Sequence, residues 1–373
     1  MRTVNRYLVP LAVVAAAVCL APATAQEKKA VVDQKRVDES IAKGLEYLRK
    51  NQSSDGSWSA QGGMYPTTMT GMAGLALVME GSTCREGKYA ETISKSVDWY
   101  LKRSQPNGLL GTPQNPSEGS RYTYGHGFGM LFLACVYGEE EDPTTRKKLE
   151  VLLKKAVDFS CKAVTKHGGW GYVSAADGGG FDEGSTTVTQ LQALRACRNA
   201  GIPVPKETID NAIKYLKMCT TPRGGLIYNY SAGGAQAGSE CPAITAAACA
   251  SACSTGMYKD KYFGMWVKYC RDNVYSRFGS NGHDEYSNLY FGQVMYVLGD
   301  DRYVSLIDPE CKPENAMKWS DYKKMAFNNY IRTQGSDGGW QPGGGWGVGP
   351  IFSTATALIL MQLEKEQVPF YQR

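Results

Sequence analysis

The sequence has no run of lysine or arginine and little net charge. Its 41 lysines and arginines oppose 36 aspartates and glutamates, which gives a formal net charge of +5. Two of the positive charges, Arg2 and Arg6, lie in a predicted signal peptide, and removing both leaves +3. Charge this small and dispersed argues against nucleic-acid binding and against electrostatic attachment to a membrane.

After its first 25 residues the sequence also lacks an apolar run long enough to span a membrane. Residues 1–25 have the pattern of a signal peptide: a basic start, a short apolar core at 7–20, and the small residues Ala-Thr-Ala at 23–25. We expect this segment to be removed and the mature chain to be exported to the periplasm or the extracellular space. Residues 26–36 are polar and are predicted to form a loose leader before a single domain at 37–373.

One stretch, residues 43–58, combines a helix, a turn and a tryptophan. The helix has an apolar stripe formed by Ile41, Leu45 and Leu48. Residues 53–56 (Ser-Ser-Asp-Gly) end it, because glycine can adopt the positive φ of a helix terminus. Trp58 is then placed to fold back over the helix end, and the Gln52 amide is expected to bond carbonyl groups left open in the last turn.

The same unit recurs along the chain at a spacing of 53 to 61 residues. Its aromatic anchors are Tyr47, Tyr100, Phe159, Tyr215, Tyr269 and Tyr330. The copy at 95–109 has Leu109 in place of the tryptophan, and the copy at 266–282 is degenerate. Self-similarity at such a period indicates a repeat architecture, in which each unit buries its apolar face against its neighbours.

The pattern of this unit, Lys43-Gly44-x2-Tyr47-Leu48-x3-Gln52-x3-Gly56-x-Trp58, resembles the QW motif of triterpene cyclases. More broadly, the chain resembles the prenyltransferase and squalene-cyclase repeat over about residues 37–365. This resemblance implies an all-α fold, a single (α/α)6 toroid of about twelve helices. Six outer and six inner helices would then surround a central cavity.

Six apolar segments alternate with these units and are poor in charged residues. They span 67–80, 124–138, 185–201, 243–256, 285–299 and 352–366. A helix that is apolar on nearly all sides is buried on nearly all sides, so these segments are predicted to form the inner ring. Their many glycine, alanine, serine and threonine residues allow six helices to approach one another closely.

Ten cysteines remain after residue 25, an even number that permits disulfides in an exported chain. Six of them recur at similar heights on the predicted inner and outer helices: Cys135, Cys161, Cys197, Cys219, Cys253 and Cys270. Repeated height favours a role as small, buried apolar side chains. A disulfide framework is the alternative.

The loops that enter the inner helices are rich in aromatic residues. The candidate ligand-binding set contains Tyr122, Tyr124, Tyr172, Tyr228, Tyr230, Tyr286 and Trp346. All inner helices of a toroid start on the same face, so these side chains are expected to converge on one cavity mouth. Aromatic rings with polar tips around a concavity suit an isoprenoid, a sterol-like ring or a sugar ring. Three further tryptophans are interpreted instead as lids that stack the repeats: Trp58, Trp170 and Trp340.

Acidic residues and histidines complete the candidate set on the same rim: His126, Asp182, Glu183, Glu240, His283, Asp284 and Glu285. A general acid or base could come from this set if burial raised a carboxyl pKa. The alternative is that the carboxylates cap inner helices at the positive end of the helix dipole. For His126, which lies between two glycines, a hydrogen-bonded structural role is the alternative.

The chemistry of the related families depends on motifs that this sequence does not have. The Asp-x-Asp-Asp acid motif of class II cyclases is absent, and the aspartate pair at 300–301 follows an inner helix, at the wrong end. Protein prenyltransferases share an Asp-x-Cys motif and a later histidine, which together bind zinc. The matching segments here are 240–242 and 283–285, and in them the cysteine and the histidine come one or two positions too early for that pattern. The Gly-Cys-Gly-Glu-Gln of thioester domains is missing too. We therefore expect no metal and no cofactor.

Three functions are compatible with these features. The chain is first predicted to be a non-catalytic toroid that binds a small hydrophobic, isoprenoid-like or carbohydrate ligand in its aromatic mouth. The alternatives are a terpene cyclase-like or lyase-type enzyme that uses the rim carboxylates, and a scaffold whose outer surface binds a protein partner. The missing acid motif favours binding over catalysis, and the density of aromatic residues on the rim favours ligand binding over the scaffold.

Overall fold

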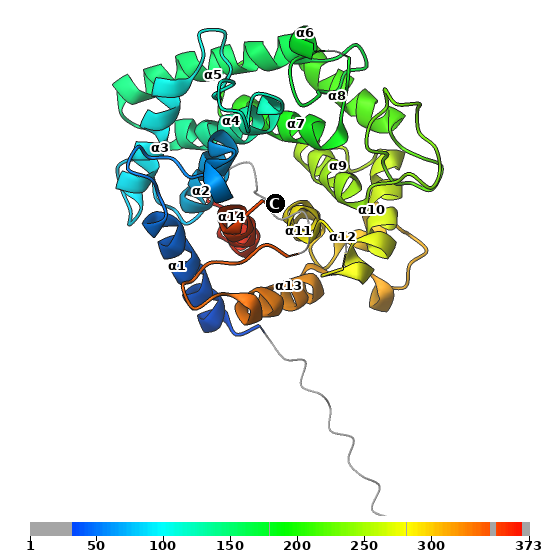
Figure 1. Ribbon diagram of the computed structural model, residues 1–373. Helices are drawn as coiled ribbons and strands as arrows, with labels where there is room; N and C mark the ends of the chain where they lie inside the picture. Colours follow the sequence, from blue (N-terminus) through cyan, green and yellow to red (C-terminus); the bar gives the residue numbers. More distant parts are fainter. Residues whose placement is uncertain (1–31, 179, 281, 344–347, 368–373) are drawn as a thin grey trace, which may run out of the picture. The chain divides into compact units, whose positions relative to one another are not determined.

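In the described part of the chain, helices are arranged in an inner and an outer ring (Figure 1). The computed structural model describes residues 32–178, 180–280, 282–343 and 348–367, which belong to one unit that begins at Val32. Within these ranges there are α-helices, short 3-10 helices and four isolated bridges, but no β-strand. The predicted signal peptide, the start of the predicted leader and Trp346 lie outside them. None of the described helices is long and apolar enough to cross a membrane.

Among the described residues, the inner ring consists of α2 (Pro66–Val78), α4 (Tyr122–Glu139), α7 (Gly184–Asn199), α9 (Pro242–Thr255), α11 (Asp284–Leu298) and α14 (Pro350–Met361). Each packs against the inner helices before and after it, and α14 packs against α2, so the ring closes. The outer ring consists of α1 (Gln34–Lys50), α3 (Ala90–Arg103), α5 (Pro143–Ala163), α8 (Lys206–Met218), α10 (Lys261–Asn273) and α13 (Trp319–Thr333). The connections contain α6 (Ala175–Gly178), α12 (Arg302–Leu306), η1 (Gln61–Gly63), η2 (Tyr275–Arg277), η3 (Pro313–Asn315) and η4 (Leu363–Lys365). This arrangement confirms the predicted all-α toroid.

Burial separates the two rings as their compositions predict. In α2 almost every residue at 67–78 is buried, whereas α1 buries a single stripe. α1 begins at Gln34, because the Asp33 side chain caps it by accepting from the Arg36 backbone N–H. The last three residues of the predicted leader, 34–36, are therefore helical.

The three lid tryptophans are held in the same way in their repeats. Each indole N–H donates to the carbonyl oxygen ten residues earlier, Trp58 to Leu48 (2.7 Å), Trp170 to Ser160 (2.8 Å) and Trp340 to Tyr330 (2.9 Å). These carbonyls belong to the last turns of outer helices, where the regular hydrogen bonds of a helix run out. All three indoles are buried, which confirms their interpretation as lids. In the second copy Leu110, rather than the predicted Leu109, occupies the equivalent position two residues after Gly108.

In five of the copies the glycine of the turn touches the next outer helix, whereas a Cβ at Gly279 or Gly282 of the degenerate copy would have nothing within 4 Å. Gly56, Gly108, Gly168, Gly224 and Gly338 have φ between +87° and +94°. A Cβ atom at these positions would lie 2.2 to 3.0 Å from the backbone carbonyl oxygens of Lys95, Lys155, Asn211, Met265 and Lys43, respectively. Only glycine fits a left-handed position with so little room. Because Gly338 packs on Lys43 of α1, the last repeat closes on the first.

Gln52 joins two repeats, whereas the sequence predicted that it would complete the end of its own helix. Its amide nitrogen donates to the carbonyl oxygens of Gly56 in the turn (3.0 Å) and of Thr92 on α3 (2.9 Å). The last repeat has equivalent bonds at 2.8 Å, from Gln334 to Gly338 and Ser40. The glutamine therefore links neighbouring outer helices. The spacing of residues along one helix could not predict a hydrogen-bond partner on another helix.

All ten cysteines in the described ranges are free thiols. Six of them are buried: Cys135, Cys197, Cys219, Cys249, Cys253 and Cys270. Five of these six occupy the predicted repeated heights, and the remaining predicted position, Cys161, is half-buried. The interpretation as packing side chains is confirmed for those five.

Candidate functional site

The first turns of α4, α7 and α11 meet around the carboxylate of Glu183. This fully buried side chain caps α7, accepting from the backbone N–H groups of Ser185 (3.0 Å) and Thr186 (2.8 Å). The predicted capping role of Glu183 is therefore confirmed. Burial raises the pKa of Glu183, and the hydrogen bonds from Ser185 and Thr186 offset part of that rise.

Two tyrosines from other inner helices close over this carboxylate. The Tyr124 hydroxyl on α4 contacts the Ser185 hydroxyl and lies 3.4 Å from the Glu183 carboxylate. On α11, the Tyr286 hydroxyl makes a long bond of 3.5 Å to the Ser185 carbonyl oxygen. Burial raises the pKa of both tyrosines well above the usual value, so both remain protonated and able to donate. These contacts bring three of the predicted site residues together.

Three further aromatic side chains, Tyr172, Phe181 and Tyr228, form what we call the aromatic face. The Tyr172 ring centroid lies 5.7 Å from that of Tyr124 and 5.5 Å from that of Phe181. The hydroxyl groups of Tyr172 and Tyr228 are in contact, and Phe181 and Tyr228 are 40% and 41% exposed. The guanidinium of Arg121 lies 5.1 Å from the Tyr172 ring centroid. Sequence reasoning missed Phe181, because it lies in an irregular loop and not at a repeated position.

Asp182 precedes Glu183 but has a separate set of partners. Its buried carboxylate bonds His167 (2.7 Å) and accepts from the Tyr215 hydroxyl (2.9 Å) and the Tyr230 backbone N–H (2.8 Å). These bonds attach the loop at Tyr230 to the start of α7. Asp182 and Tyr230 therefore organise the loop beside the aromatic face.

His126 is on α4 and its side chain contacts α5, with both ring nitrogens hydrogen-bonded. Its Nδ1 accepts from the Leu110 backbone N–H (3.0 Å), and its Nε2 bonds the Ala156 carbonyl (3.1 Å) and the Ser160 hydroxyl (3.0 Å). In four other repeats the equivalent N–H donates to a threonine hydroxyl, that of Thr70, Thr187, Thr245 or Thr354. His126 thus replaces a structural threonine. Burial lowers its pKa to about 4, so it is neutral at pH 7.

The other predicted site residues make contacts with separate segments. Tyr122 bonds Asp177 and accepts from the Ser174 N–H, Glu240 accepts from Thr221 and Gly238, and Glu285 accepts from Gly343 and Ser353. His283 is exposed and Asp284 half-exposed at the start of α11. Each bonded carboxylate in this group joins a loop or a neighbouring helix. In the described part of the chain, no group of three or more histidine, cysteine, aspartate or glutamate side chains is placed to hold a metal.

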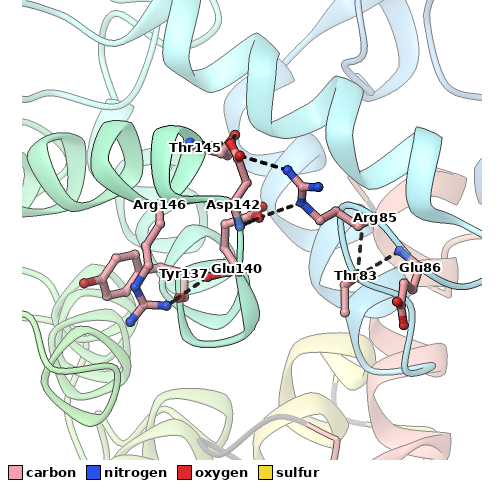
Figure 2. Close-up of polar contacts among 8 residues, drawn as sticks. All are labelled: Thr83, Arg85, Glu86, Tyr137, Glu140, Asp142, Thr145 and Arg146. Carbon is pink, nitrogen blue, oxygen red and sulfur yellow. Dashed lines mark hydrogen bonds and ion pairs between the residues drawn. The ribbon is translucent and has the colours of Figure 1, made fainter.

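A second polar cluster lies where the loops after α2 and α4 meet (Figure 2). Arg85 bonds Glu140 (3.3 Å) and Asp142 (3.1 Å) beside a cavity of about 250 Å³ that Cys84 also lines. Arg146 donates to the Tyr137 and Glu140 carbonyl oxygens at the end of α4, both at 3.0 Å. Burial and Glu140 raise the pKa of the Cys84 thiol to about 12, so it is unreactive at neutral pH. This cluster therefore fastens two loops together.

The described helices form an α/α toroid, the fold that the resemblance of the repeats implied. No family model matches the chain. A stretch of 86 residues is 31% identical to human lanosterol synthase and spans 23% of this chain and 12% of that enzyme.

Solved structures share the fold over nearly their whole length. The type II terpene cyclase MstE from Scytonema aligns with a TM-score of 0.54 and 13% identity, over 90% of this chain and 100% of that one. A GH76 α-mannanase from Bacteroides thetaiotaomicron aligns with a TM-score of 0.58 and 13% identity, over 87% and 94%. An inactive GH76A α-1,6-mannanase of Salegentibacter, in complex with α-1,6-mannotriose, aligns at 0.55 and 11% identity, over 87% and 98%. Identities this low show the fold alone.

Proposed function

We propose that this chain binds a carbohydrate on the aromatic face formed by Tyr172, Phe181 and Tyr228. The observation that carries the proposal is the partial exposure of these rings beside a buried carboxyl group, Glu183. Partly exposed rings with hydroxyl tips present apolar faces and hydrogen-bonding groups together, which suits the C–H faces and hydroxyl groups of a sugar. The α-1,6-mannotriose complex of a structural neighbour supports this ligand class.

An isoprenoid is the alternative ligand, and the terpene cyclase neighbour supports it. An isoprenoid has almost no polar groups and needs an enclosed apolar pocket to remove it from water. The aromatic face is open to solvent at Phe181 and Tyr228 and carries Arg121. We therefore favour the carbohydrate.

A carbohydrate-cleaving enzyme is the second candidate function. Burial raises the pKa of Glu183, as a general acid requires, and the Tyr124 hydroxyl lies beside it. Glycoside hydrolysis generally needs a second carboxyl group across the scissile bond. The adjacent Asp182 is occupied by His167, Tyr215 and the loop at Tyr230. Binding without cleavage is therefore the better-supported proposal.

The proposal agrees with export. Polysaccharides are encountered outside the cytoplasm, where the signal peptide predicted at residues 1–25 would direct the mature chain. A protein-binding scaffold is the remaining alternative, and it predicts no affinity for any sugar.

Calorimetric titration of the purified protein tests the proposal, with α-1,6-mannotriose, cellotriose and farnesol as probes. Phe181→Ala is expected to weaken saccharide binding about tenfold, because an aromatic contact is worth about 1 kcal/mol beyond its buried area. Val151→Ala is the control, since Val151 is a similarly exposed apolar residue (45%) on the outer helix α5. Absence of saccharide binding at millimolar concentration, or equal affinity of Phe181→Ala and the unaltered protein, would overturn the proposal. Release of smaller sugars during incubation would indicate the enzyme instead.

A further inference from the structure

Arg121 places a positive charge beside the aromatic face. Its exposed guanidinium lies over the Tyr172 ring, 5.1 Å from the centroid. Burial raises the pKa of Tyr228, and the charge of Arg121 opposes that rise, so the guanidinium acts on a second tyrosine of the face. Ion pairs of the described part of the chain hold four other arginines, Arg49, Arg85, Arg103 and Arg271, but none of them includes Arg121.

The carboxylate that precedes Arg121 in the sequence is bonded elsewhere. Glu118 is buried, and its carboxylate accepts from the backbone N–H groups of Thr67 (2.6 Å) and Thr112 (3.1 Å). It also accepts from the hydroxyl groups of the same two threonines, at 2.8 and 2.9 Å. Four donors inside the protein therefore satisfy Glu118, and the guanidinium of Arg121 is left at the surface without it.

Two further carboxylates of this region also have partners of their own. Asp177 bonds the Tyr122 hydroxyl. Glu183 is fully buried and accepts from backbone N–H groups at the start of α7. Arg121 therefore remains an exposed charge beside the aromatic face that no described carboxylate neutralises.

Arg103 shows the same arrangement with its carboxylate present. Its guanidinium lies over the Trp99 ring, 5.3 Å from the centroid, and forms an ion pair with Asp55 at 3.1 Å. A guanidinium over a ring keeps N–H groups at its edge available for an anion. Arg121 has the ring of this arrangement and lacks the anion.

We propose that the carbohydrate bound on the aromatic face is acidic, and that Arg121 binds the carboxylate of a uronic acid. The planar guanidinium presents parallel N–H groups to both oxygens of a carboxylate, which fixes the orientation of the sugar as well as attracting it. The rings of the aromatic face then cover the apolar face of the same sugar. This inference rests on the proposed function and adds the chemical class of the saccharide.

Calorimetric titration with trigalacturonate and with its methyl ester tests the inference, because the two probes share their rings and linkage and differ in charge. At neutral pH the acid is expected to bind about fivefold more tightly than the ester, the gain from one ion pair at an exposed site. Arg121→Gln should abolish this preference, and Arg121→Lys should retain part of it, since lysine keeps the charge but not the planar fork. The control is Arg103→Gln, which removes an equal charge from a ring on the outer helix α3 and should keep the full preference.

A salt titration of the unaltered protein adds a test that needs no variant. Raising sodium chloride from about 20 mM to about 0.5 M should reduce the preference for the acid, because salt screens an exposed pair. Equal affinity for acid and ester, a preference that salt does not reduce, or a preference that Arg121→Gln retains would each overturn the inference. Binding of the ester or of α-1,6-mannotriose would then leave the proposed function standing. If no saccharide binds, the proposed function fails and this inference fails with it.

Discussion

Gln192 on α7 donates to the side-chain oxygen of Gln293 on α11 at 3.0 Å, although α9 lies between these helices in the ring. Both side chains are buried. The contact therefore crosses the inside of the ring and fixes the distance between two helices that support the candidate site.

Removing one member of this pair is expected to be costly. Gln192→Ala leaves the Gln293 oxygen buried without its partner, which should lower the free energy of unfolding by about 1–3 kcal/mol. Urea titration followed by circular dichroism measures the change. The double variant Gln192→Leu/Gln293→Leu is the control, and it should cost less than the sum of the single variants Gln192→Leu and Gln293→Leu because neither amide is stranded. Additive losses would contradict the pairing.

Gly338 and Gly256 provide a matched pair for the turn geometry. Both have positive φ, +92° and +75°, but a Cβ at Gly338 would meet the Lys43 carbonyl oxygen at 2.6 Å, whereas nothing lies within 4 Å at Gly256. Gly256→Ala should cost about 1–2 kcal/mol for the left-handed backbone alone. Gly338→Ala should cost about 1–3 kcal/mol more, because the added methyl overpacks the contact. Equal losses in thermal or urea unfolding would show that the ring does not close at Lys43.

Acid should destabilise the protein through His126. Burial lowers its pKa in the folded state to about 4, against about 6.5 in the unfolded chain. As pH falls through 6.5 the unfolded state takes up the proton first, so the stabilising contribution is complete above pH 6.5 and is lost between pH 6.5 and 4. The loss amounts to about 3 kcal/mol.

His126→Thr checks this origin, since threonine occupies the equivalent position in four repeats. The variant is expected to retain a bond to the Leu110 N–H, and its unfolding free energy should vary less between pH 7 and 4.5 than that of the unaltered protein. Parallel pH profiles for the two proteins would assign the acid sensitivity to other groups.

The cysteines should titrate as thiols. All ten in the described part of the chain are free, and six are buried. Ellman titration of the denatured, unreduced protein is expected to find about ten thiols, and the native protein should react slowly because burial hides the sulfur atoms. Fewer than about two free thiols after denaturation would restore the disulfide framework.

The repeat pattern was sufficient to predict the fold, because it depends on local chemistry. Trp58 folds back on the helix that precedes it, which ends at Lys50, and Gly56 belongs to the turn between them, so their spacing carries the information. Partners in neighbouring repeats are not encoded in this way. The bond from Gln52 to α3 and the replacement of a threonine by His126 became evident only with the helices side by side.

For the candidate site, the sequence predicted which helix ends meet but not the partners of each side chain. Shared helix direction correctly brought Tyr124, Glu183 and Tyr286 together at the starts of inner helices. Adjacent acidic residues have unrelated partners, however, because Asp182 bonds the loop at Tyr230 while Glu183 caps α7. At the start of a helix, the side chains of two consecutive residues can point in different directions. The spacing of residues in the sequence does not predict which partner each of them will have.

The contact between Gly338 and Lys43 also protects the first and last repeats from unfolding before the others. In an open array of repeats the end units have one neighbour each and melt first. Here the first and last outer helices are neighbours, so every repeat is held on both sides. The order of repeats along the chain then matters less than their order around the circle. A circular permutant, joined through its present ends and cut in an exposed loop such as 231–239, would preserve every interface between repeats.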